Sequence, residues 1–312
     1  MSNHTVIHKL SRTAGNNSIF FKREDLLPFS FGGNKARKAV LYFEEINRLG
    51  CDTIVTYGSA CSNHCRVIAN IAAANDLHCV IINPEEDNGI NTCNRTMIKI
   101  FGAQIIFCPV SKVGETIEQT MNALLESHAK PYYIEGGGHG NIGTQAYVTC
   151  YEEVCAYEKS NKVSFDYIFH ASGTGTTQAG LVCGCMMGSG RQKIIGISIA
   201  RQSKHGRGVI TKCVADYFTS INREVSETDV NNATYFVDTY ICGGYGNYNP
   251  GIISTIKSVL SYEGVALDPT YTGKAFWGMK EYIRKHNING KNILFIHTGG
   301  QPIFFDTLGG LL

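Results

Sequence analysis

Short apolar runs alternate with longer amphipathic stretches along the whole chain. The runs are rich in β-branched residues and are apolar throughout, rather than at every second position. They occupy residues 53–57, 79–83, 104–110, 132–136, 166–172, 193–200 and 292–299. Strands of this kind are buried on both faces, because helices cover both sides of a parallel sheet. The pattern therefore predicts an α/β protein with twisted, mainly parallel sheets flanked by helices.

The stretches between the runs carry the helix and loop signals. Residues 113–129 are amphipathic and long enough for a helix, whereas residues 222–250 are irregular and predict a loop. The sequence contains no internal repeat and no linker rich in proline or serine. In a parallel sheet, the loops that leave the carboxyl ends of the strands form the binding crevice. We therefore expect the functional residues in the loops that follow the apolar runs.

Composition narrows the class of protein. The chain has 312 residues, 43% of them hydrophobic, and its net charge of +2 gives no reason to expect nucleic acid or a membrane as a partner. No run reaches the roughly 18 apolar residues of a membrane span, and the opening residues do not resemble a secretory signal. The 12 cysteines are then expected to be reduced, mostly buried thiols of a cytoplasmic protein, and their spacing predicts no metal site.

Glycine is abundant, with 34 residues, and several glycine clusters adjoin the predicted strands and helices. In the first cluster, GGNK at 32–35, Lys35 opens a helical stretch. This lysine is either an ordinary first-turn residue or the amine of a Schiff base. In the second case, burial and the neighbouring cations Arg37 and Lys38 would lower its pKa.

Two further clusters precede predicted helices. In YGSACSNHCR (57–66), Ser62 and Asn63 can cap a helix, and the N–H groups at the same helix start also suit a carboxylate. In ASGTGTTQAGL (171–181), small residues expose successive N–H groups, which favours a phosphate site over a hairpin turn. The donors of that site would be Gly173, Thr174, Gly175, Thr176 and Thr177.

A fourth cluster, GGGHGNIG at 136–143, contains a formal dinucleotide fingerprint, GxGxxG. The acidic residue that such a site requires should end the next strand, about 20 residues later. Glu158 has this spacing but lies in the helical stretch before that strand. We interpret the match as accidental.

Three more residues occupy positions that favour contact with a ligand. Tyr245 and Tyr271 lie in loops with neighbouring glycines, and Thr298 follows the last apolar run. With the amine, the carboxylate site and the phosphate site, they provide what pyridoxal 5′-phosphate requires. The chain resembles the fold-type II pyridoxal-phosphate enzymes, in the branch of D-cysteine desulfhydrase and 1-aminocyclopropane-1-carboxylate deaminase. The resembling segments are KREDLLPFSFGGNKARK, SNHCR, SGTGTTQAGL, YGNYNP, DPTYTGKAFWGM and HTGGQP.

The resemblance implies a role for each residue. Lys35 would form the Schiff base, and Ser62, Asn63 and His64 would lie at the substrate carboxylate and the cofactor hydroxyl. Tyr245 and Tyr271 would be active-site tyrosines, and Lys35, Ser62, Tyr245 and Tyr271 would be catalytic. The cofactor-binding residues would be Lys35, Lys38, Asn63, Gly173, Thr174, Gly175, Thr176, Thr177, Thr272 and Thr298.

The resemblance also implies an arrangement of domains. Residues 1–42 and 149–312 would form a large cofactor-binding domain, and residues 43–148 a small α/β domain. The cofactor would lie between the two domains, and a homodimer is the usual state of this family.

Two positions distinguish the chemistries of the family. The deaminase branch has glutamate and leucine where this chain has Thr272 and Thr298, whereas the desulfhydrase branch has hydroxyl residues. A hydroxyl partner leaves the cofactor ring a weaker electron sink, which suffices for a good leaving group. We therefore expect α,β-elimination on a small amino acid, D-cysteine first, giving pyruvate, sulfide and ammonia.

The alternatives are ring opening by a deaminase, elimination on another β-substituted amino acid, and an inactive amino-acid-binding paralogue. Cys61 stands where the family usually has glutamine and adjoins the carboxylate site, so it bears directly on substrate identity.

Overall fold

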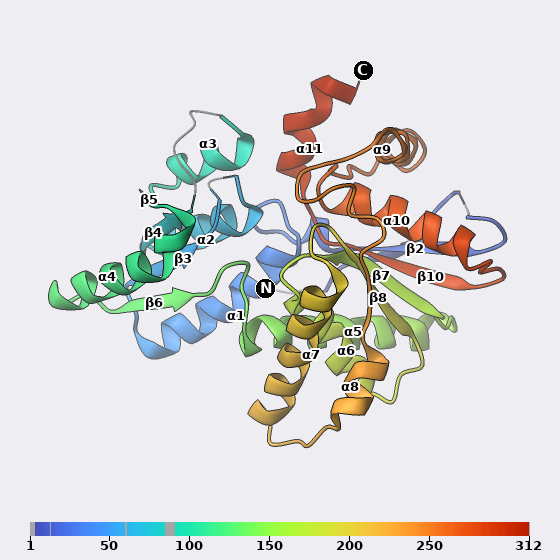
Figure 1. The fold of residues 1–312 in the computed structure, drawn as a ribbon, viewed down its shortest axis with the longest axis horizontal. Coiled ribbons are helices and arrows are strands. Elements are labelled where there is room, and N and C mark those ends of the chain that lie inside the picture. Colours follow the sequence, from blue (N-terminus) through green and yellow to red (C-terminus); the bar gives the residue numbers. More distant parts are fainter. Residues whose placement is uncertain (1–3, 13, 60, 85–90, 312) are drawn as a thin grey trace. The chain divides into compact units, whose positions relative to one another are not determined.

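The structure is a computed structural model that describes residues 4–12, 14–59, 61–84 and 91–311. The chain divides into two units, which we call the large unit (up to Asn34 and from Gly143 onward) and the small unit (Lys35–Ile142) (Figure 1). Each unit has its own sheet. They are described separately below.

The sheet of the large unit has the strand order β1-β2-β10-β7-β8-β9. Its described neighbours pair in parallel, except for the antiparallel pair β1 and β2. The strands are β1 (Ile7–Lys9), β2 (Ser18–Arg23), β7 (Tyr167–Ser172), β8 (Lys193–Ser198), β9 (Tyr235–Val237) and β10 (Asn292–His297). The helices are η1 (Glu24–Leu26), α5 (Asn141–Asn161), α6 (Thr176–Met187), α7 (Ser203–Ser220), α8 (Glu227–Ala233), α9 (Pro250–Glu263), α10 (Thr272–Lys285), α11 (Gln301–Thr307) and η3 (Leu308–Leu311).

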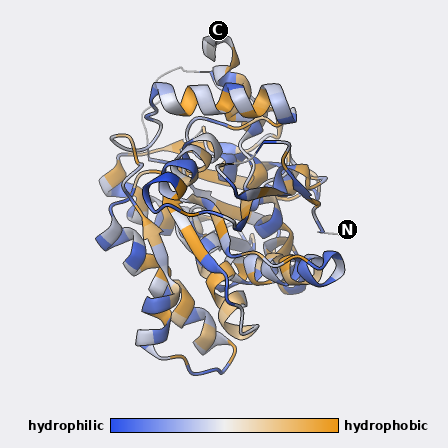
Figure 2. Ribbon diagram, turned by 90° about the vertical axis from the view of Figure 1, so that its right-hand side faces the viewer, coloured by the Kyte–Doolittle hydropathy of each residue, from blue (hydrophilic) through white to orange (hydrophobic). Residues whose placement is uncertain are grey.

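Helices cover both faces of this sheet, with α9 and α10 on one side and α5 and α6 on the other (Figure 1). The central strands are consequently buried on both faces, and the ribbon shows them as mainly hydrophobic (Figure 2). Phe21, Phe276 and Phe295 meet in the core with ring centroids 5.1–5.5 Å apart. Each buried side chain of this size contributes about 1.5–3 kcal/mol. The parallel α/β fold expected from the apolar runs is confirmed.

The small unit contains a parallel sheet of order β5-β4-β3-β6. On one face, Val55, Val80 and Ile82 pack against Ile117 and Met121 of α4. Because side chains alternate along a strand, α2, which contacts the same strands, covers the other face. The elements are α1 (Asn34–Leu49), β3 (Thr53–Tyr57), α2 (Asn63–Ala73), β4 (His78–Asn83), α3 (Cys93–Ile100), β5 (Gln104–Phe107), η2 (Val110–Lys112), α4 (Val113–Glu126) and β6 (Pro131–Ile134).

The sequence pattern missed some elements. The region 222–250, predicted as a loop, contains the short helix α8 and the edge strand β9. Ser226 caps α8 by accepting the N–H of Asp229 at 3.0 Å, a short polar signal outweighed by the irregular surroundings. The edge strand β1 and the strand β2 were also missed, because β2 ends in charged residues and is not apolar throughout.

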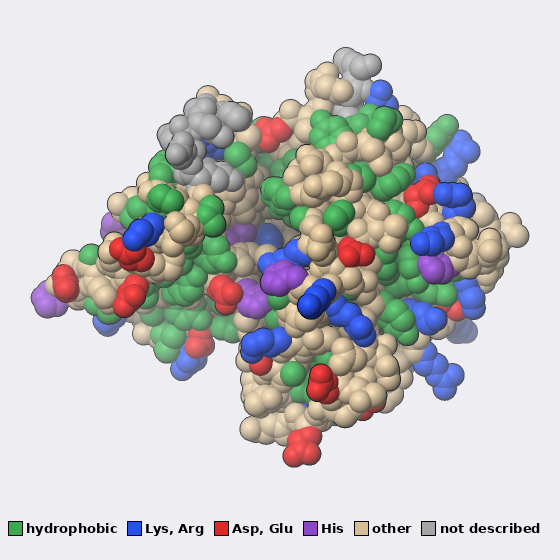
Figure 3. All heavy atoms as spheres, viewed as in Figure 1, with side chains coloured by type: hydrophobic (Ala, Val, Ile, Leu, Met, Phe, Trp, Pro, Cys, Tyr) green, Lys and Arg blue, Asp and Glu red, His purple; other side chains and the backbone are tan. Residues whose placement is uncertain are grey.

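In the described part of the chain, no helix combines the length and the apolar character that crossing a membrane requires. Acidic and basic side chains are interspersed over the face of the molecule shown in Figure 3.

Candidate active site

The glycines before Lys35 let the chain pass the end of strand β10. Gly33 has φ +92°, and a Cβ there would lie 2.7 Å from the carbonyl oxygen of Thr298. The next N–H, that of Asn34, donates to the same carbonyl at 3.0 Å. Any other side chain at residue 33 would break this contact, so the flexible backbone serves a close approach rather than mobility.

Lys35 itself lies in the first turn of α1. Its Nζ donates to the carbonyl of Gly137 at 2.7 Å. Burial lowers the pKa of this amine to about 8, and the Cys65 thiol opposes the shift. The cause is therefore burial rather than the neighbouring cations that the sequence suggested. Roughly a tenth of the amine is then neutral at pH 7, so a nucleophile is available.

The loop that contains the GxGxxG pattern contacts this lysine. It follows β6 and offers the Gly137 carbonyl to Lys35, while the Tyr42 hydroxyl donates to the carbonyl of His139. Lys38 is buried in α1, and its side-chain stem packs beside Gly138. The glycines of this loop thus bring backbone carbonyls to the side chains of α1.

The start of α2 combines a cap with an oriented amide. Ser62 Oγ accepts the N–H of His64 at 3.1 Å, which leaves the hydroxyl proton free to donate elsewhere. Asn94 of α3 donates through Nδ2 to the Cys61 carbonyl (2.8 Å) and to Asn63 Oδ1 (2.9 Å). A carbonyl can only accept, so these two bonds fix both amides and leave the Asn63 NH₂ group to serve a ligand.

The side chain of His64 is hydrogen-bonded inside the small unit. Its ring is buried, and Nε2 lies 2.9 Å from the Thr56 hydroxyl. Since that hydroxyl donates to the Ile134 carbonyl, it must accept from Nε2–H. Burial, followed by the charges of Lys35 and Lys38, holds the pKa of His64 well below its ordinary value. The structure gives the His64 ring a supporting role beneath the start of α2, and the contact of His64 with substrate stays a prediction.

The loop before α6 leaves its helix start open. Gly175 precedes the helix with φ +104° and has no side chain with which to cap the first turn. Thr177 Oγ1 accepts from Asn34 Nδ2 at 3.1 Å, and the Thr174 carbonyl accepts from Arg201 Nη1 at 3.3 Å. The first N–H groups of a helix lack an intrahelical acceptor, so this end attracts an anion.

Buried Gln178, which the sequence did not single out, braces the same turn. It accepts from Ser172 Oγ at 3.0 Å and donates to the Tyr235 carbonyl at 2.7 Å. The bonds join the first turn of α6 to strands β7 and β9.

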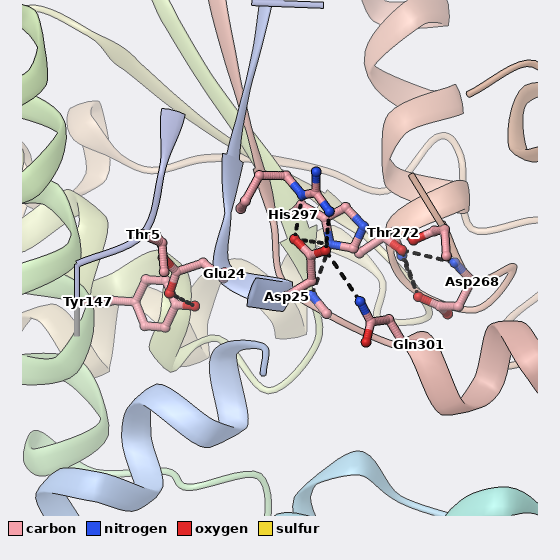
Figure 4. A network of polar contacts seen from close by, with 11 residues as sticks. Thr5, Glu24, Asp25, Tyr147, Asp268, Thr272, His297 and Gln301 are labelled. Atoms are coloured by element: carbon pink, nitrogen blue, oxygen red, sulfur yellow. Dashed lines mark hydrogen bonds and ion pairs between the residues drawn. The ribbon is translucent and has the colours of Figure 1, made fainter. Parts of the chain in front are cut away.

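The two predicted tyrosines meet in the large unit. The hydroxyls of Tyr245 and Tyr271 are 2.7 Å apart, with their rings edge to face. The adjacent Thr272 hydroxyl donates to Asp268 Oδ2 at 2.8 Å (Figure 4). Asp268 also accepts from the N–H groups of residues 270–272, so the carboxylate is used within this turn.

Thr298 follows strand β10, whose carboxyl end lies beside the ion pair of Arg23 and Asp25. The preceding His297 lies 3.5 Å from Asp25, which Arg23 binds through two hydrogen bonds of 2.7 and 2.8 Å (Figure 4). Burial raises the pKa of Asp25, but His297 and Arg23 outweigh it, so the pKa is lowered. Thr298 is buried, and none of the described residues hydrogen-bonds its hydroxyl. That hydroxyl remains available to a ligand.

Residues 4–299 match the family model described as pyridoxal-phosphate dependent enzyme. The chain belongs to this family.

Among its relatives, a D-cysteine desulfhydrase of Yersinia pestis (strain Pestoides F) is 33% identical, with 98% of this chain and 94% of that protein covered. A D-cysteine desulfhydrase of Serratia proteamaculans is 31% identical, covering 96% and 92%. A solved structure titled as an ACC deaminase homologue is 30% identical, with a TM-score of 0.88 and coverage of 99% and 94%. The predictions of a pyridoxal-phosphate-dependent lyase, its fold and its cofactor are confirmed.

The residues present fit this cofactor. The deprotonated form of Lys35 suits the aldehyde, the open start of α6 suits the phosphate, and the oriented amide of Asn63 suits the ring hydroxyl. Thr298 can offer a hydroxyl to the ring nitrogen, whereas the Thr272 proton is already donated to Asp268.

Proposed function

We propose that this enzyme eliminates the β-substituent of a small amino acid, with D-cysteine as its first candidate substrate. The products would be pyruvate, sulfide and ammonia. Two relatives named D-cysteine desulfhydrase, 33% and 31% identical over nearly the whole chain, support the proposal. The ACC deaminase homologue supplies the alternative, opening of a cyclopropane ring.

The observation that carries the proposal is the hydroxyl at residue 272. Residue 272 is a buried threonine whose hydroxyl donates to Asp268, so this position provides no carboxylate of the kind that the deaminase branch places there. The oxygens of Asp268 are engaged by residues 270–272. With only a hydroxyl near the ring nitrogen, the ring withdraws electrons less strongly. This is sufficient to expel a thiolate but ill suited to a carbon leaving group.

Each residue then has a defined task. Bound pyridoxal phosphate supplies an aldehyde for the substrate amine and a ring that eases loss of the Cα proton. Ser62 and the start of α2 bind the substrate carboxylate. Lys35, with its lowered pKa, accepts the Cα proton, and the pair Tyr245–Tyr271 delivers a proton to the departing sulfur.

The decisive experiment measures pyruvate and sulfide released from each enantiomer of cysteine, and 2-oxobutanoate from 1-aminocyclopropane-1-carboxylate. We expect sulfide and pyruvate in equal amounts from D-cysteine, lost in Lys35→Ala. Ring opening without sulfide would refute the proposal. Binding of amino acids without any turnover would indicate a paralogue that only binds. We further propose a homodimer, to be checked by light scattering of the purified protein.

A further inference from the structure

Lys274 is a buried cation that pairs with backbone rather than with acid. It lies in the first turn of α10 and is fully buried. Its Nζ donates to the carbonyls of Ile199 (2.9 Å), Ile241 (3.1 Å) and Gly244 (2.8 Å). Within the described ranges, no carboxylate lies at ion-pairing distance from this amine. An ammonium group has three donors, so all three are used.

The three carbonyls come from two segments that need an anchor. Two belong to residues 241–246, which we call the tyrosine loop because it carries Tyr245. This loop has left-handed backbone at Cys242 (φ 52°) and at three glycines, so its sequence alone leaves it poorly ordered. The third carbonyl, that of Ile199, follows strand β8. Lys274 therefore ties the tyrosine loop to the sheet and to α10.

We propose that Lys274 is a positioning residue, whose ammonium holds the tyrosine loop so that Tyr245 meets Tyr271. Tyr271 lies three residues before Lys274, and Gly244 immediately precedes Tyr245. One cation thus fixes both partners of the 2.7 Å contact between the tyrosine hydroxyls. The inference rests on the proposed function in so far as the tyrosine pair delivers protons in elimination.

The segment that Lys274 holds also contacts the loop before α6. Two residues beyond Ile199 lies Arg201, whose carbonyl accepts from Ser198 Oγ at 2.7 Å and whose Nη1 reaches the Thr174 carbonyl. The segment that Lys274 holds is thus the one that supports Thr174. A burial cost as large as that of an ammonium without a carboxylate is offset only by well-formed hydrogen bonds, which makes the geometry specific.

The test compares Lys274→Met, which keeps an unbranched apolar side chain but removes the three donors, with Lys257→Met at an exposed lysine of α9. Site-resolved alkylation, read by mass spectrometry, reports on Cys242 in the tyrosine loop and on buried Cys213 in α7. We expect Cys242 to react at least about tenfold faster in Lys274→Met, with Cys213 unchanged, and no change at either cysteine in Lys257→Met. Equal acceleration at both cysteines, or none at Cys242, would overturn the proposal.

Turnover gives the second readout. If the loop acts through Tyr245, kcat for elimination falls in Lys274→Met and in Tyr245→Phe, and the double variant loses little more than either single variant. Fully additive losses would contradict the proposal. If the wild type releases no sulfide, the proposed function fails, but the alkylation ratio still decides whether Lys274 holds the loop.

Discussion

Helices α2 and α6 start differently, although each follows a buried parallel strand and a run of small residues. The start of α2 is capped, because Ser62 Oγ accepts the His64 N–H. The start of α6 follows Gly175, which has no side chain with which to cap the first N–H groups. The large unit thus has an open helix start and the small unit a partly occupied one.

The difference matches the two anions that this enzyme must bind. A phosphate carries close to two charges and several acceptor oxygens, so it benefits from every exposed N–H group. A substrate carboxylate carries one charge and must leave after each turnover. We propose that the substrate carboxylate binds at α2, where the Ser62 hydroxyl supplements the helix start and provides selectivity with weaker binding. We infer that α6 holds the cofactor phosphate and that Ser62 at the start of α2 selects the substrate, while the neighbouring Asn63 amide contributes to cofactor binding.

The largest expected effect concerns Lys35, whose pKa is set mainly by burial rather than by either helix start. Because burial favours the neutral amine, it should lose its proton at lower pH than an ordinary lysine. Acetylation of the cofactor-free protein at Lys35 should rise with pH and reach half its maximum near pH 8, the pKa given by burial. At pH 7 its neutral fraction is then roughly 300-fold above that of a lysine with the usual pKa. A midpoint above pH 10, by site-resolved mass spectrometry, would contradict this environment.

Gly175→Ala should disrupt the open helix start of α6. A Cβ at φ +104° is strained and would lie 3.1 Å from Ile210. Strain of this kind costs about 1–3 kcal/mol, which corresponds to a roughly 5- to 150-fold weaker Kd for pyridoxal phosphate. Gly208→Ala in α7 is the matched control, since no atom lies within 4 Å of its added Cβ. Fluorescence titration measures both, and unchanged affinity in Gly175→Ala would remove α6 from the cofactor site.

Asn94→Ala tests the amide chain that prepares the start of α2. Without the Asn94 donor, Asn63 is free to turn its oxygen toward the ligand. The loss of one hydrogen bond of about 1 kcal/mol predicts a roughly fivefold weaker Kd for pyridoxal phosphate. Asn75→Ala removes a comparable amide, which donates to the Ile71 carbonyl at the other end of α2, and should leave this Kd unchanged. Equal effects of the two variants would indicate general loosening of the small unit.

Ser62→Ala should have the smallest of these effects. It should lower the free energy of unfolding by about 1 kcal/mol, because one helix cap is lost. Ser226→Ala removes the equivalent cap of α8 and should cost a similar amount. Urea denaturation measures both. A Ser62→Ala variant as stable as the wild type would show that the hydroxyl is committed to the ligand rather than to the helix.

The sequence predicted the parts of this site that rest on local pattern. Apolar runs located the central strands, and small residues before Asn63 and Thr176 located the two helix starts. Local signals also placed Tyr245 and Tyr271 in loops, and the structure brings them together.

Local sequence patterns could not predict contacts between residues that are far apart in the chain. Asn94 is 31 residues from the amide that it orients, and Lys274 is 75 residues from the Ile199 carbonyl. The position of the His64 ring was not predictable for a similar reason, because Thr56 and Ile134 determine where the ring points. The role of the loop at 136–143 depends on the hydrogen bond from Lys35 to the Gly137 carbonyl, which the sequence alone does not predict.

The most direct test of the two helix starts measures two constants in the same two variants: the Kd for pyridoxal phosphate and the KM for D-cysteine, each in Gly175→Ala and in Ser62→Ala. Saturating cofactor is used for the KM. We predict that Gly175→Ala weakens cofactor binding with little change in KM, whereas Ser62→Ala raises KM severalfold and leaves the cofactor Kd unchanged. If each variant changed both constants by similar factors, the assignment of the cofactor phosphate to α6 and of the substrate carboxylate to Ser62 would be wrong.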